Sequence, residues 1–180
     1  SIIVRSVEEW GERDPGVTTR RTHAACRAHM PIKVQYDCIG VGSSVKSEYN
    51  RWVDEGLIDQ RQIKFVPWSA GAKVINPYER VIPDDDLSPL NREMFGNFKA
   101  QAWWALRTRF YKTWRALTEG TVYSVDELIS LDSSMPLLQQ LKKELAQPTK
   151  GDSGSLQMIV NKTPNGMKSP NLADSVVQAM

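Results

Sequence analysis

Two aspartates lie at positions where a carboxylate could take part in a binding or catalytic site. Asp37 lies on the polar side of an expected strand, just before the sequence Ile-Gly-Val-Gly. The carboxyl ends of strands are where α/β sheets bind ligands. Asp37 could equally cap the next turn, because aspartate side chains accept hydrogen bonds from the backbone two residues further on. The residues alone leave both interpretations open.

Asp174 is the second candidate. It falls in an early turn of an expected C-terminal helix that has Ser169 as its cap and Pro170 at its first position. The helix dipole favours a negative charge there, so a purely structural role is one interpretation. On the helical wheel Asp174 lies beside an apolar stripe, on a flank from which a side chain can enter a cleft. The stripe consists of Leu172, Ala173, Val176, Val177 and Met180.

A stretch rich in cations and aromatic residues is the third candidate. Between Lys99 and Arg115 there are five basic residues and no acidic one, interleaved with tryptophan and tyrosine. Such a helix could grip a phosphate backbone, and salt should weaken that binding. The alternative is that the aromatic rings fill the core while the charged groups stay in water. The basic residues are Lys99, Arg107, Arg109, Lys112 and Arg115.

Three other motifs do not support a site. The stretch from Gly40 to Ser47 resembles a phosphate-binding loop, but Val45 stands where the nucleotide-binding pattern needs glycine. Adjacent carboxylates in the loop at 84–86 point in different directions, whereas hard cations need convergent ligands. His23 and His29 are six residues apart and match neither a metal pair nor a catalytic arrangement.

The elements that must position the candidates alternate between strand and helix. The apolar run at 1–4 predicts a strand whose neighbour could lie upstream, and residues 19–29 suit a helix. A strand from Ile32 to Cys38, a helix ending at Gly56 and a strand at 62–68 then predict a crossover unit.

The second half of the chain is expected to be mainly helical. A loop at 70–90 precedes the long helix, which carries the basic residues described above. Shorter helical patterns cover 125–131 and 135–146. A flexible segment at 148–154, a strand at 156–161 and a turn at Asn165-Gly166 precede the last helix.

Composition excludes several classes of protein. The chain has 180 residues, 41% of them hydrophobic, and a net charge of +2, which predicts one globular domain rather than a polybasic protein. Cys26 and Cys38 form no zinc-ligand pair and no disulfide framework, as expected of a reducing cytosol. No apolar run approaches the length needed to cross a bilayer, so neither a membrane nor a secretory route is expected.

Three stretches together resemble the nuclease domain of tailed-phage large terminases, in their residues, order and spacing. They are Tyr36-Asp-Cys-Ile-Gly-Val-Gly, Asn97-Phe-Lys-Ala-Gln-Ala-Trp-Trp-Ala-Leu-Arg and Lys168-Ser-Pro-Asn-Leu-Ala-Asp-Ser-Val. The resemblance covers nearly the whole chain and implies that residues 1–180 form a single nuclease domain. It also implies an α/β, ribonuclease H-like fold with a central mixed β-sheet flanked by helices.

The resemblance further implies a metal-dependent endonuclease. By motif position, Asp37 is the second acidic metal ligand and Asp174 the last. Two Mg²⁺ or Mn²⁺ ions held by hard oxygen ligands can activate water and stabilise the leaving oxygen of a phosphodiester. Lys162 or Lys168 would offset the developing phosphate charge, and Gly40 and Gly42 would let DNA approach the backbone. The first family aspartate has no match here, so it lies upstream or another carboxylate replaces it.

The implied partners follow from the same family. Large terminases cut concatemeric double-stranded viral DNA, so DNA contacts are expected at Lys99, Arg107, Lys112 and Lys168. An ATPase domain upstream, the portal protein and the small terminase subunit are the expected protein partners, in the cytoplasm of the bacterial host. The alternatives are a non-catalytic DNA-binding or docking module that uses the helix from Lys99 to Arg115 and, less favoured, a resolvase or integrase.

Overall fold

The computed structural model describes residues 1–11, 14–39, 43–59 and 61–180. Contacts between residues divide the chain into two units. The first contains Ser1–Glu9, Ala70–Gln178 and Met180, and the second contains Trp10–Ser69 and Ala179. Asp37 therefore belongs to the second unit and Asp174 to the first.

The second unit is a crossover of two parallel strands, as the sequence predicts. Strand β2 pairs with β3 along its whole length, from Lys33 opposite Lys64 to Asp37 opposite Trp68. Apolar residues of both helices and both strands form its core, in which Cys26 and Trp52 are buried. The elements in chain order are α1 (Pro15–His29), β2 (Lys33–Asp37), α2 (Ser43–Asp54) and β3 (Lys64–Trp68).

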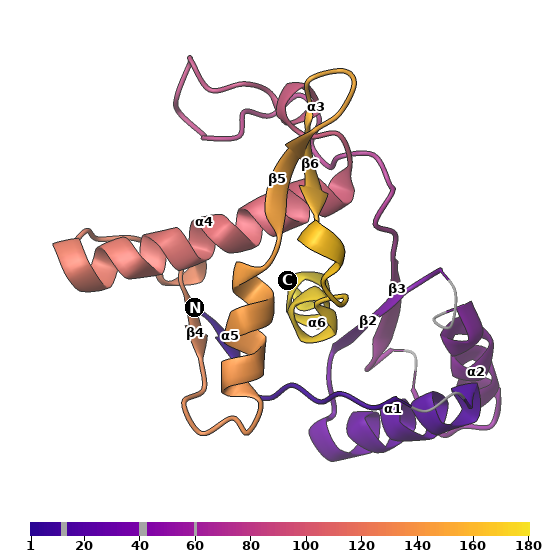
Figure 1. Ribbon diagram of the computed structural model, residues 1–180. Helices are drawn as coiled ribbons and strands as arrows, with labels where there is room; N and C mark the ends of the chain where they lie inside the picture. The colour runs from indigo at the N-terminus through magenta and orange to yellow at the C-terminus, as the bar shows by residue number, and fades with distance from the viewer. Residues whose placement is uncertain (12–13, 40–42, 60) are drawn as a thin grey trace. The chain divides into compact units, whose positions relative to one another are not determined.

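The first unit is built around the long helix α4, drawn in pink in Figure 1. Asn97 caps α4 by accepting a hydrogen bond from the backbone N–H of Ala100, and Gly120 ends it at a positive φ that suits glycine. Ala100, Trp103 and Leu106 form its buried face. The elements are β1 (Ile2–Val4), α3 (Asn91–Met94), α4 (Phe98–Glu119), η2 (Val125–Glu127), β4 (Ile129–Leu131), α5 (Leu138–Ala146), β5 (Thr149–Asp152), β6 (Met158–Asn161), η3 (Pro164–Gly166) and α6 (Asn171–Ala179).

Hydrogen bonding between strands corrects two local expectations. Residues 125–131 were expected to be helical, but only a 3-10 turn forms, and Ile129–Leu131 pairs in parallel with Ile2–Val4. One neighbour of the N-terminal strand thus lies downstream. The expected flexible segment contains β5, which pairs with β6 as an antiparallel hairpin. Ile129–Leu131 pairs with a distant segment and β5 with the neighbouring β6, and in both places strand pairing outweighs local composition.

The sheets are smaller than expected. The described residues form three two-stranded sheets, β1 with β4, β2 with β3 and β5 with β6, two of them parallel and one antiparallel. The mixed α/β class is confirmed, whereas the central mixed sheet is not confirmed among the described residues, because each of their strands pairs with only one other. Among the described residues no helix is both long and apolar enough to span a membrane.

Candidate active site

Asp37 stands at the last position of β2, where the strand's backbone still pairs with Trp68. Its side chain is exposed, and Oδ1 accepts a hydrogen bond from the backbone N–H of Ile39 at 2.9 Å. The turn-capping interpretation of Asp37 is therefore observed. It does not exclude a metal role, because no described residue donates a hydrogen bond to Oδ2. Gly40 and Gly42 lie outside the described residues.

Asp174 is held more firmly. Its side chain is 18% exposed and forms an ion pair with Lys162, whose ammonium group contacts Oδ2. Lys162 directly follows β6, so the end of the β5–β6 hairpin places the lysine ammonium group beside the first turn of α6. The structure thus brings together two of the predicted site residues. The carboxylate is desolvated in part, and the nearby ammonium offsets that cost.

The N-terminus of α6, the helix that carries Asp174, is capped by a residue of another helix. The expected Ser169 cap is not formed, because α6 starts at Asn171 and has no side-chain cap of its own. Instead, Glu144 of α5 accepts hydrogen bonds from the N–H groups of Leu172 and Ala173 at 2.7 and 3.2 Å. These groups are among the four that a helix start leaves unpaired. Figure 1 shows α5 and α6 side by side.

Two further contacts fix the surroundings of this turn. The Nε2 group of Gln147 donates to the carbonyl oxygens of Lys162 and Lys168 at 2.5 and 2.8 Å, which ties together the ends of the segment between β6 and α6. Glu9 accepts hydrogen bonds from Gln140 and Asn171. These bonds, Gln140 first, lower the pKa of Glu9, and the charge of Lys168 adds to the effect. Sequence patterns cannot reveal this network, since its members lie on separate elements.

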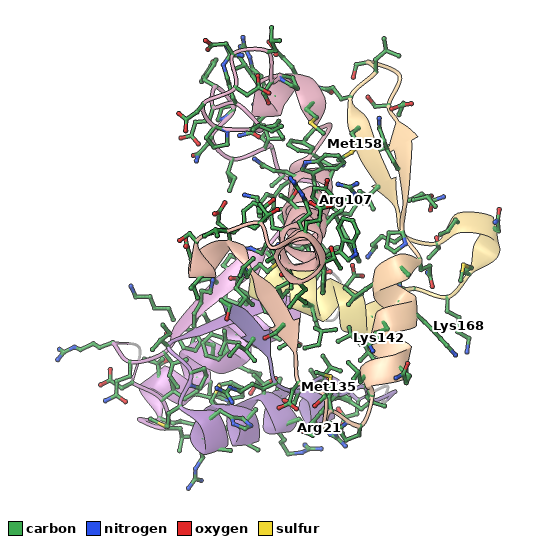
Figure 2. All side chains as sticks on the ribbon, turned by 90° about the vertical axis from the view of Figure 1, so that its left-hand side faces the viewer. Arg21, Arg107, Met135, Lys142, Met158 and Lys168 are labelled. Carbon is green, nitrogen blue, oxygen red and sulfur yellow. The ribbon has the colours of Figure 1, made fainter. Side chains whose placement is uncertain are left out.

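Of the three predicted DNA contacts on α4, Lys112 and Arg107 have partners within the chain. Lys112 forms an ion pair with Glu127, and this hydrogen bond is the largest cause that lowers the pKa of Glu127. Arg107 lies over the ring of Trp104, with 4.8 Å from Cζ to the ring centroid. Lys99 is half-buried and Lys168 is exposed. Figure 2 labels Arg107 on α4 and Lys168 on the segment before α6.

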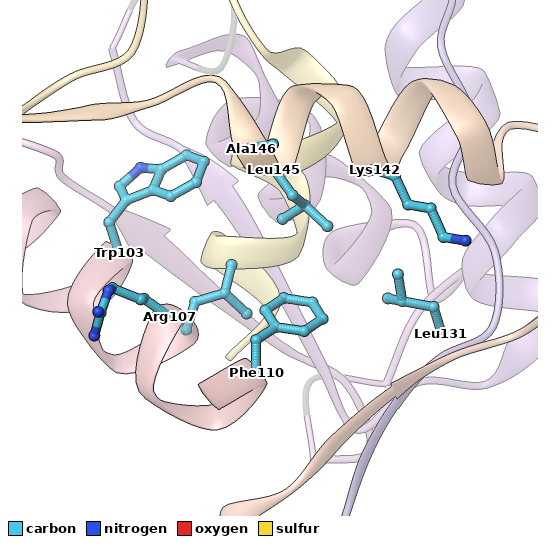
Figure 3. A pocket seen from close by; sticks show the side chains of 8 residues that line it. Trp103, Arg107, Phe110, Leu131, Lys142, Leu145 and Ala146 are labelled. Carbon is cyan, nitrogen blue, oxygen red and sulfur yellow. The ribbon is translucent and has the colours of Figure 1, made fainter. Parts of the chain in front are cut away.

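A cavity of about 400 Å³ lies between α4 and α5 (Figure 3). Its walls are mostly apolar, with Arg107 and Lys142 as the charged residues, and it contains no carboxylate. It therefore lacks the oxygen ligands that hard cations require. Over the described residues, no group of three or more histidine, cysteine, aspartate or glutamate side chains is arranged to hold a metal. The run at 84–86 behaves as the expected turn, since Asp85 accepts from the N–H of Leu87.

Comparisons with known proteins identify the fold. The chain is similar to the nuclease domain of the large terminase subunit gp2 of bacterial virus Sf6. A mutant form with manganese has a TM-score of 0.79 and 21% identity, covering 97% of this chain and 77% of that one. Another structure of this Sf6 nuclease domain, described without a mutation, has a TM-score of 0.71 and 22% identity. The match covers 88% of this chain and 69% of that one. No protein-family model and no curated protein sequence matches.

The likeness confirms a mixed α/β fold similar to that of a terminase nuclease domain. It extends over nearly the whole chain, so both units contribute to it. A third similar structure is a mutant of the same terminase domain with calcium, at a TM-score of 0.79 and 21% identity over 97% of this chain and 76% of that one. At this level of identity the shared property is the fold of a terminase nuclease domain, while the chemistry must be argued from this chain's residues.

Proposed function

We propose that this chain is the nuclease domain of a tailed-phage or prophage large terminase. It acts as a metal-dependent endodeoxyribonuclease that cuts concatemeric double-stranded viral DNA at the start and end of packaging. The observation that carries the proposal is the match to a terminase nuclease domain over 97% of the chain at a TM-score of 0.79. Asp37 and Asp174 fall within the sequence stretches that resemble this family.

The donor chemistry of the two aspartates fits a hard divalent cation. Carboxylate oxygens are the ligands that Mg²⁺ and Mn²⁺ prefer. Asp37 is exposed at a strand end, and Asp174 is part-buried beside a lysine. The similar Sf6 structures contain manganese or calcium, which supports a divalent-ion site. We assign Asp37 and Asp174 as ligands of two such ions, with a further carboxylate expected from the strand upstream.

Bound ions would supply an activated water and charge stabilisation at the leaving oxygen. The chain's own contribution is positioning. Glu144 fixes the first turn of α6 and thereby the backbone of Asp174, whose N–H bonds to the carbonyl of Pro170 at 2.8 Å. Lys162, adjacent to Asp174, can donate to a phosphate oxygen and offset the negative charge that develops there. Lys168 is the second cation available near the start of α6.

The packaging context follows from the same proposal. The DNA translocase activity would reside in an ATPase domain of the same protein. The portal protein and the small terminase subunit would be its partners in the host cytoplasm. The likeness of the fold to a terminase domain supports this context.

The test is cleavage of supercoiled plasmid in Mn²⁺ by the chain, joined to the upstream residues expected to supply the first aspartate. Asp37→Asn and Asp174→Asn should each lower the cleavage rate by at least about 100-fold, more than the 10- to 100-fold losses typical of groups that only support a metal ligand. DNA binding should be retained, because neither change removes a cation.

Asp59→Asn is the matched control. Asp59 belongs to the same unit as Asp37, and its Oδ1 accepts from the N–H of Arg61 at 2.8 Å, the same turn-capping bond that Asp37 makes. If Asp37 only caps a turn, the two variants will cut equally well and the assignment is wrong. A parent protein that binds DNA without cutting it in Mn²⁺ would instead favour the docking module.

A further inference from the structure

One face of α1 carries positive charge that the proposed catalytic site does not use. The helix contains three arginines and two histidines but no acidic residue. Arg20, His23 and Arg27 are three and four residues apart, and this spacing places them on one face. α1 belongs to the same unit as Asp37.

This charged face of α1 also forms a hollow on the surface. Arg20, His23, Ala24, Arg27 and Ala28 line an open hollow of about 550 Å³. Both alanines are exposed, and their side chains end at Cβ. An anion can therefore approach the helix surface between the two guanidinium groups. Seven residues separate Arg20 from Arg27, which corresponds to about 10.5 Å along the helix axis.

The two arginines are available to a ligand. Arg20 is 72% exposed, and its ion pair with the equally open Asp14 is long, at 3.7 Å. Such surface pairs contribute little and are easily exchanged. Arg27 is exposed and forms no ion pair with any residue that the structure describes. By contrast, Arg51 in the same unit contacts Glu48 at 2.6 Å and Glu55 at 3.4 Å.

The rest of α1 holds this face in place. Cys26 is only 2% exposed and packs with Trp52 and the other apolar residues of the unit's core. The ring of His23 also lies against Trp52, with 5.2 Å between the ring centroids. These contacts anchor α1 to the rest of its unit, so Arg20 and Arg27 extend from a fixed backbone and lose less freedom when they bind.

We infer that the α1 face formed by Arg20, His23 and Arg27 contacts the phosphate backbone of double-stranded DNA. The inference rests on the proposed function, which makes DNA the substrate. Guanidinium groups match phosphate oxygens in geometry and charge. The axial distance of about 10.5 Å between them corresponds to about three phosphate steps of one strand, each of which rises about 3.4 Å along the duplex axis. Contacts of this kind position a duplex without reading its sequence.

The test is the salt dependence of DNA binding. A short fluorescent duplex is titrated with the protein in Ca²⁺ at several salt concentrations, and the slope of log K against log salt is measured. Each lost phosphate contact lowers the magnitude of the slope by about 0.9. Arg20→Gln/Arg27→Gln should thus lower it by about 1.8, and Arg27→Gln alone by about 0.9. Arg51→Gln removes one positive charge from the same unit but should leave the slope unchanged.

Plasmid cleavage by the parent in Mn²⁺ is measured in parallel. If the parent cuts and binds but the double variant keeps the parent's slope, the α1 inference is wrong and the nuclease proposal stands. If Arg51→Gln lowers the slope as much as Arg27→Gln does, net charge rather than the α1 face is responsible, and the inference again fails. If the parent neither binds nor cuts DNA, both proposals are overturned.

Discussion

The two basic helices, α1 and α4, differ in what their cations contact. On α4, Lys112 and Arg115 have carboxylate partners within the same unit, Glu127 and Glu119. Arg107 is stacked on Trp104. On α1, the charged face is exposed, and its one carboxylate contact among the described residues, between Arg20 and Asp14, is long. The number of cations in a helix therefore does not indicate how many are available to a phosphate backbone.

The helices also differ in what they bury. α4 buries Ala100, Trp103 and Leu106 on one face, whereas the buried residues of α1 are Thr19 and Cys26. The interpretation in which aromatic rings of α4 pack in the core is confirmed for Trp103, whereas Tyr111 and Trp114 are exposed. DNA binding by the cations of α4 stays a prediction. α4 thus contributes a buried face to the core of its unit, whereas DNA binding by α1 stays a proposal.

The largest expected effect tests the framework role of α4. Leu106 is 2% exposed, so Leu106→Ala should lower the free energy of unfolding by about 2 to 5 kcal/mol. Arg27→Gln on α1 should change it by no more than about 0.5 kcal/mol, because it alters an exposed side chain. Urea unfolding followed by tryptophan fluorescence measures both. A loss below 1 kcal/mol for Leu106→Ala, on the order of a surface change, would show that α4 is not part of the core.

The next prediction tests whether the ion pair with Glu127 keeps Lys112 of α4 from contacting DNA. Glu127→Gln removes the carboxylate partner of Lys112 while keeping an oxygen that can accept the bond from the N–H of Ser124. If Lys112 is then free to reach a phosphate, the salt slope of DNA binding should rise in magnitude by about 0.9.

Glu48→Gln is the matched control for this change. It removes the same charge in the other unit, but Arg51 keeps Glu55 as a partner. The slope should therefore stay at the parent's value. An unchanged slope for Glu127→Gln as well would mean that α4 does not face DNA at all, and the predicted contact at Lys112 would have to be abandoned.

The sequence predicts elements well where the pattern is local. The stripe of Val45, Tyr49 and Trp52 predicts α2, and the strands on either side pair in parallel as expected. The misses are two short strands, β4 and β5. Ile129 pairs with Ile2, more than a hundred residues away, and no local pattern contains that information. Strand β5 is polar and contains Gly151, so only its pairing with β6 reveals it.

The residues of the candidate site also divide into those that a local sequence pattern predicts and those that it does not. Asp37 and Asp174 can be chosen from the sequence because strand ends and helix starts have recognisable residues. The ion pair between Lys162 and Asp174 agrees with their closeness in sequence. Glu144 cannot be chosen, since it caps α6 from 28 residues away in the chain. Glu127, the partner of Lys112, is missed for a similar reason, since it lies beyond the end of α4 and 15 residues further along the chain.

The smallest expected effect concerns the pKa of Glu127. The hydrogen bond from Lys112 is the largest cause that lowers this pKa, followed by the bond from the backbone of Ser124. Lys112→Met should therefore raise the pKa towards its ordinary value without restoring it fully, as measured by carboxyl NMR titration. An unchanged pKa would show that the ion pair does not persist in solution, and Lys112 would then be as available as Arg27.

The same pair fixes the sign of a pH dependence. Because the folded-state pKa of Glu127 is lowered, its pairing with Lys112 stabilises the fold above the carboxyl's unfolded-state pKa. That stabilisation is lost as the pH falls through the lowered folded-state value. The parent should therefore be more stable than Lys112→Met at neutral pH, and the difference should vanish in acid. A difference that persists below the folded-state pKa would instead arise from the packing of the lysine chain against Tyr123, whose ring centroid lies 5.4 Å from Nζ.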